Sequence, residues 1–113
     1  MSRSDDQRMA DILDAAGELA VIALRGHEAF LADAILRRAA ERLLEIIGEA
    51  ANSLSETTTG RFPEIGWRDL ARLRILLAHH YQRVDPEQVW TIAIGDVPAL
   101  AARLSDGRPR YRW

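Results

Sequence analysis

The chain has 113 residues and a mass of 12.7 kDa, the size of a single domain. Its 48% hydrophobic and 28% charged residues are typical of a folded globular protein and exclude a disordered chain. The longest apolar runs, residues 19–24 and 75–78, are too short for the ~20 residues of a membrane helix. The N-terminus opens no apolar signal-peptide region. We therefore expect a cytoplasmic protein that does not bind membranes.

The chain has no cysteine, which excludes disulfides, cysteine–zinc sites and thiol catalysis. The net charge of −2 argues against a protein that coats nucleic acid without selectivity. All 15 basic residues are arginine. Arginine favours bidentate contacts with phosphate, but a genome biased toward GC-rich codons gives the same composition.

Apolar residues recur with helical spacing along most of the chain. Residues 5–24 predict a first helix, which ends at Arg25 and Gly26, the latter suited to a left-handed cap. Residues 27–53 predict a second helix that, if continuous, is ~40 Å long at 1.5 Å per residue. Such a length is unusual in so small a domain and indicates that part of the helix packs against something else.

Turn-forming residues predict a loop over 55–66, followed by a third helix over 67–81. Asp85 and Pro86 begin a fourth helix, with Asp85 as N-cap and Gln88 placed to complete a capping box. The segment 96–98 interrupts this helix and restarts it. We expect an all-α fold, an antiparallel bundle of four and at most five helices. Residues 1–106 form the domain, and 107–113 form a tail of alternating arginines and aromatics that either contacts RNA or is an ordinary chain terminus.

The histidines do not predict a metal site. His79 and His80 are adjacent, so on a helix they diverge by ~100° and cannot hold one metal ion from one face. The sequence contains no His-Glu-x-x-His motif, no cluster of acids at ligand spacing and no glycine-rich phosphate loop. We expect neither a metal nor a cofactor.

The end of the third helix carries a set of residues suited to RNA chemistry: Arg74, His79 and Tyr81. A neutral histidine can take a proton from a ribose 2′-hydroxyl or return one to a leaving oxygen. Arginine can stabilise the additional charge of the transition state, and tyrosine can contact phosphate or stack on a base. Because the 2′-hydroxyl is the nucleophile, such a site cuts RNA without a metal and spares DNA.

Helical geometry separates these residues, because Arg74 shares a face with Tyr81 while His79 lies ~140° away. Three explanations remain open: the helix ends or bends near Ala78, the arginine reaches across, or a second copy of the chain completes the site. The simplest alternative is that His79 and His80 only cap the helix C-terminus, where positive charge is favoured.

Several segments together resemble the HepT-like branch of the HEPN superfamily, and the similarity spans nearly the whole chain. They are Ile46-Ile47-Gly48-Glu49-Ala50, Pro63-Glu64-Ile65-Gly66-Trp67, Arg74-x4-His79-x-Tyr81-x2-Val84-Asp85-x4-Trp90, and Val97-Pro98-x-Leu100. The resemblance implies an all-α homodimer that acts as a metal-independent ribonuclease toxin of a bacterial toxin–antitoxin pair. It also implies that Arg74 and His79 line a cleft between the two protomers, which answers the angular mismatch.

The resemblance further implies a partner, a minimal nucleotidyltransferase antitoxin of the MntA type. In that family the antitoxin transfers AMP to the motif tyrosine, here Tyr81. Added phosphate groups would repel RNA and pair with Arg74, so the same tyrosine would contact RNA and act as the off switch.

One residue departs from the family pattern: Ile75 stands where a polar residue, often asparagine, commonly follows the arginine. An apolar side chain cannot orient a phosphate by hydrogen bonding, so His80 substitutes in part or the chain is an inactive HEPN scaffold for the nucleotidyltransferase. A shifted motif, Arg72-x6-His79, fits the flanking residues less well. A plain structural bundle without a partner is a third, weaker hypothesis.

Overall fold

The structure of the protein is a computed structural model in which residues 3–79 and 84–106 are described. The described chain is helical and contains no strand, as the sequence predicted. Its elements are α1 (Asp5–Ala23), α2 (His27–Ala32), α3 (Ala34–Ser53), α4 (Glu56–Gly60), α5 (Trp67–His79), α6 (Pro86–Thr91), the π-helical segment η2 (Ile92–Asp96) and α7 (Val97–Asp106).

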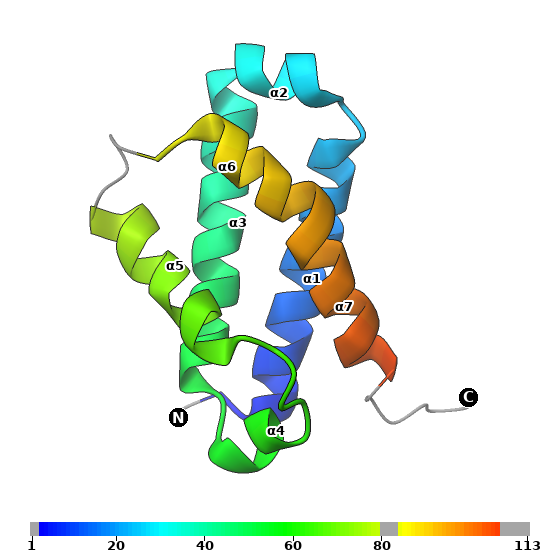
Figure 1. Cartoon of the computed structure of the whole chain (residues 1–113), viewed down its shortest axis with the longest axis vertical. Helices are drawn as coiled ribbons and strands as arrows, with labels where there is room; N and C mark the ends of the chain where they lie inside the picture. The colour runs from blue at the N-terminus through cyan, green and yellow to red at the C-terminus, as the bar shows by residue number, and fades with distance from the viewer. Residues whose placement is uncertain (1–2, 80–83, 107–113) are drawn as a thin grey trace.

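Four long helical units form an antiparallel bundle, which confirms the predicted fold class. In Figure 1, α1 and α5 run upward, whereas α3 and the continuous unit α6–η2–α7 run downward. Helix α3 is central, because it packs against both α1 and α5, and α7 packs against α1. Within the described ranges, no helix is both long and apolar enough to cross a membrane.

Helix α1 begins where the sequence predicted, at a complete capping box. The Ser4 hydroxyl accepts a hydrogen bond from the Gln7 amide, and the Gln7 side chain accepts one from the Ser4 amide, so two amides at the helix start are satisfied. The apolar stripe of α1 lies in the core, with Ile12 and Leu19 fully buried. The sequence periodicity therefore identified both the helix and its buried face.

The predicted continuous helix over 27–53 is wrong, because the chain breaks at Asp33. This residue has an extended backbone (φ −111°, ψ 106°), and its carboxylate accepts hydrogen bonds from the Ile35 and Leu36 amides. Asp33 is thus the N-cap of a new helix. Helix α3 has 20 residues, about 30 Å at 1.5 Å per residue, so its length no longer requires a second chain to cover it.

The predicted loop over 55–66 contains the short helix α4, whose N-cap is Ser55. Asp5 at the start of α1 holds this helix in place: its carboxylate accepts hydrogen bonds from the Ser55 hydroxyl and amide and from the Thr58 hydroxyl. These bonds, with Ser55 contributing most, lower the pKa of Asp5 below its ordinary value of 3.8. The loop that follows is fixed by Trp67, whose indole N–H points at two of its carbonyl oxygens.

The fourth helical unit begins at Asp85, whose carboxylate accepts a hydrogen bond from the Glu87 amide, with Pro86 at the first helical position. The predicted interruption at 96–98 is wrong, because the helix continues through a π-helical turn over Ile92–Asp96. Pro98 has no amide hydrogen, and its ring would clash with a carbonyl of an α-helical turn before it. The wider π turn just before Pro98 allows the helix to continue without a break.

Candidate functional site

The structure describes the side chain of Arg74 and the backbone of His79, which is the last residue of α5. Two of the predicted site residues, His80 and Tyr81, lie outside the described residues, as does the tail over 107–113. The structure therefore gives the arginine side of the predicted site in atomic detail.

Arg74 sits where α3 and α5 approach each other most closely, and Gly48 makes this approach possible. A Cβ atom added at Gly48 would lie 2.7 Å from the Leu70 carbonyl oxygen, 2.9 Å from the Arg74 amide nitrogen and 3.2 Å from the Arg74 Cβ. Real Cβ atoms essentially never come within 3.0 Å of such backbone atoms. Only glycine at position 48 lets α5 lie at this distance, so Gly48 fixes where Arg74 stands.

The Arg74 side chain is only 31% exposed, and its Nε atom is buried. No hydrogen-bond partner for Nε is found among the described residues, but the Glu49 Oε2 atom lies 3.7 Å away. That distance is within ion-pair range and too long for a hydrogen bond. Arg74 therefore has a carboxylate beside its inner nitrogen, on the side that faces α3.

Helix α5 continues without a break through position 79, which excludes the explanation that the helix ends or bends near Ala78. Positions 74 and 79 consequently lie about 140° apart around one helix axis. Two of the three explanations for the angular separation remain: the arginine reaches across, or a second copy of the chain supplies the other half of the site.

The residues that follow the motif arginine lie on the outer side of α5. Ile75 and Leu76 are 45% and 39% exposed, large values for apolar side chains in the middle of a helix. Arg72, the arginine of the shifted motif, is exposed as well. The family departure at Ile75 thus falls on a surface position, away from the α3 side on which Arg74 meets Glu49.

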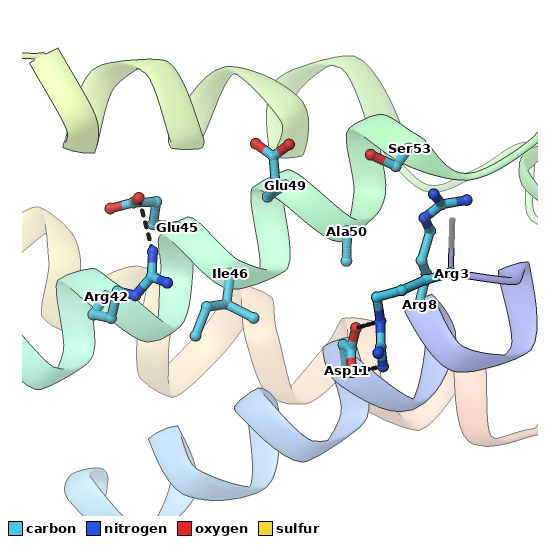
Figure 2. Close-up of a pocket in the computed structure, with 9 residues that line it drawn as sticks. All are labelled: Arg3, Arg8, Asp11, Arg42, Glu45, Ile46, Glu49, Ala50 and Ser53. Atoms are coloured by element: carbon cyan, nitrogen blue, oxygen red, sulfur yellow. Dashed lines mark hydrogen bonds and ion pairs between the residues drawn. The ribbon is translucent and has the colours of Figure 1, made fainter. Parts of the chain in front are cut away.

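Glu49 also lines a hollow between α1 and α3 with a volume of about 390 Å³. Figure 2 shows its carboxylate directed toward α5, while Arg3, Arg8 and Arg42 surround the hollow below it. Arg3 is bidentate to Asp11 at 2.7 and 2.8 Å, and Arg42 pairs with Glu45 at 2.9 Å. The arginines of this hollow are therefore charge-balanced by their neighbours, and Glu49 is the carboxylate that faces the motif arginine.

A second hollow, of about 600 Å³, lies between the first half of α5 and the η2–α7 unit. Its lining is mainly apolar, with Leu70, Leu73 and Leu100 among its walls and the Glu64–Arg103 ion pair at its rim. The described part of the chain holds no group of three or more histidine or acidic side chains that could bind a metal ion.

Comparison with known proteins assigns the family. The sequence model described as "Ribonuclease HepT-like" matches residues 12–106. A Methanocaldococcus jannaschii protein named "Putative RNase" is 36% identical over 81% of this chain and 71% of its own length. "Probable ribonuclease HepT" of Thermococcus cleftensis is 39% identical over 68% of this chain and 70% of its own length.

A further M. jannaschii protein, also named "Putative RNase", is 31% identical over 88% of this chain and 94% of its own length. No solved structure matches the chain. The helical bundle and the match over most of its length place the chain in the HEPN class of all-α proteins. Within that class, the chain belongs to the HepT-like ribonuclease family, as the motif residues indicated.

Sequence reasoning identified Arg74 but did not recognise the roles of Gly48 and Glu49. Both residues belong to the segment 46–50 that carried the family resemblance. Nothing in a sequence shows which residue of one helix meets which residue of another, because the register between packed helices is set by tertiary contacts.

Proposed function

We propose that the protein is a metal-independent endoribonuclease and the toxin of a toxin–antitoxin pair. The observation that carries this proposal is the Arg74 guanidinium, half-buried and anchored at the α3–α5 contact, in a chain of the HepT-like ribonuclease family. A fixed guanidinium can bind the scissile phosphate in a bidentate manner and stabilise the charge that develops on it.

In the proposed reaction the His79 imidazole takes the proton of the ribose 2′-hydroxyl. The 2′-oxygen then attacks phosphorus, and the bond from phosphorus to the 5′-oxygen breaks. The leaving 5′-oxygen receives a proton from a second imidazole, protonated before the step. The products are a 2′,3′-cyclic phosphate and a 5′-hydroxyl, so atoms and charge balance without a metal.

The proposal includes a homodimer, since two imidazoles are needed and each chain supplies one His79. The 140° separation of positions 74 and 79 in an unbroken helix supports a site shared between two protomers. Exposed Ile75 and Leu76 on α5 support the same arrangement, because apolar side chains at the centre of an interface contribute through burial.

The test is cleavage of a mixed-sequence RNA by the purified protein and by Arg74→Ala and His79→Ala. We expect each substitution to abolish cleavage and growth inhibition, while light scattering shows the same dimer mass. Arg68→Ala, an exposed arginine on the same helix, is the matched control and should retain activity. Cleavage that persists unchanged in either motif variant would refute the proposal.

The finer proposal concerns control by a nucleotidyltransferase antitoxin that transfers AMP to Tyr81. Each added AMP brings a negatively charged phosphate beside a site built to bind phosphate, which disfavours RNA. The intact mass of the protein, expressed with and without the antitoxin, tests this step. AMP additions that map to Tyr81 support it, and an unmodified Tyr81 in a neutralised complex contradicts it.

The competing function is a HEPN dimer that binds the nucleotidyltransferase without cutting RNA. Ile75 favours this alternative, because its exposed apolar side chain cannot hydrogen-bond a phosphate. The cleavage assay separates the two functions: RNA breakdown that is absent, or that persists in His79→Ala, favours the binding module.

A further inference from the structure

Glu49 occupies a defined place relative to Arg74, on the neighbouring helix and directly after the glycine that lets the two helices meet. Gly48 brings the backbone of α5 against α3 at Arg74, and the next residue directs its carboxylate toward α5 (Figure 2). The contact between Glu49 and Arg74 is therefore built into the packing of the two helices and does not depend on a flexible loop.

The carboxylate stands beside one particular nitrogen of the guanidinium. Glu49 Oε2 is 3.7 Å from Arg74 Nε, and Nε is buried without a hydrogen-bond partner among the described residues. A guanidinium has five N–H donors in a planar fork. A carboxylate at Nε leaves the edge formed by the two terminal nitrogens available for a phosphate.

The pair is loose in this structure. The Glu49 side chain is 64% exposed, so solvent screens the attraction and the pair alone adds little stability. A shortening of roughly 0.8 Å would give a charge-assisted hydrogen bond of ordinary length. Its value to the protein is thus in orientation, not in holding the fold together.

We propose that Glu49 is the positioning residue for Arg74. This inference rests on the proposed ribonuclease function and deepens it. By accepting the Nε–H, Glu49 fixes the rotation of the guanidinium so that its terminal nitrogens face the scissile phosphate. The same negative charge weakens RNA binding slightly, because it lies next to a phosphate site.

These two effects make an unusual kinetic prediction for Glu49→Ala. We expect kcat to fall about tenfold, the loss of one hydrogen bond to a charged group, while KM stays constant or decreases. Glu49→Gln keeps an oxygen acceptor and should recover most of kcat, with the lower KM. A variant that is merely misfolded would not bind RNA more tightly.

The matched control is Glu45→Ala, which removes a carboxylate one turn earlier on α3 that pairs with Arg42 instead. It should leave kcat unchanged. The Nε–Hε resonance of Arg74 in NMR spectra gives a second readout without RNA: Glu49→Ala should shift it and Glu45→Ala should not.

The outcomes are distinguishable. An unchanged kcat in Glu49→Ala, together with Arg74-dependent cleavage by the wild-type protein, overturns the role of Glu49 and leaves the ribonuclease intact. Absence of Arg74-dependent cleavage refutes the ribonuclease and the positioning role with it. An Arg74 resonance that does not respond to Glu49→Ala overturns the contact itself.

Discussion

The close approach of α3 and α5 at Gly48 predicts that Gly48→Ala destabilises the protein. The new methyl group would lie 2.7 Å and 2.9 Å from two backbone atoms of α5, so the helices must separate by several tenths of an ångström. Overpacking of this kind costs up to about 3 kcal/mol. Replacing glycine by alanine within a helix returns about 1 kcal/mol, which leaves a net loss of about 2 kcal/mol.

The predicted loss is measurable as a shift of the melting temperature. With about 2.1 cal/mol/K of unfolding entropy per residue, a chain of 113 residues has about 0.24 kcal/mol/K in total. A loss of about 2 kcal/mol therefore lowers Tm by about 8 °C. Because α5 carries Arg74, RNA cleavage should fall further than the unfolded fraction alone explains.

Gly17→Ala is the matched control, since Gly17 is also inside a helix but a Cβ there meets nothing within 4 Å. It should raise Tm by about 4 °C, from the helix propensity alone. Both variants and the wild-type protein are compared by thermal melts at one protein concentration, because dimerisation makes Tm depend on concentration. A Gly48→Ala protein that melts at or above the wild-type temperature would refute the reasoning.

Three further predictions follow from other contacts. Asp5→Asn should cost about 1–2 kcal/mol at pH 7; because folding lowers the pKa of Asp5 below 3.8, this contribution is present above that pH and lost as the pH falls through the folded pKa, so urea titrations at pH 7 and pH 3 should show the difference from wild type shrinking. Trp67→Phe should lower Tm by about 4–8 °C in thermal melts, since two loop carbonyls lose their indole donor. RNA cleavage should persist in EDTA and stop when the ribose at the cut site lacks its 2′-hydroxyl; inhibition by EDTA, measured on gels, would contradict attack without a metal.

Local signals in the sequence predicted the parts of the fold that local chemistry decides. Ser4 begins α1 and Asp85 begins α6 because each side chain satisfies amides in its own first turn. The break at Asp33 was missed because the apolar stripe keeps its helical spacing across the cap, so periodicity alone does not show it. The helix α4 depends on Asp5, which is 50 residues away from Ser55 in sequence, and no local pattern reveals such a contact.

The candidate site divides in the same way. The spacing of Arg74 and His79 in one helix was readable from the sequence, and so was their angular separation. The contact of Arg74 with Glu49 was not, because it depends on how far α5 slides along α3, and that is fixed where a glycine removes the side chain between them.

The π-helical turn over Ile92–Asp96 has a consequence for how this family tolerates insertions and deletions. The turn holds one residue more than an α-helical turn would, and the buried positions Val89, Ala93, Val97, Leu100 and Leu104 stay aligned across it. Deleting exposed Gly95 would restore regular winding and rotate every later side chain by about 100°. Leu100 and Leu104 would then turn out of the core, so the phase of the last ten residues of the bundle depends on keeping that extra residue.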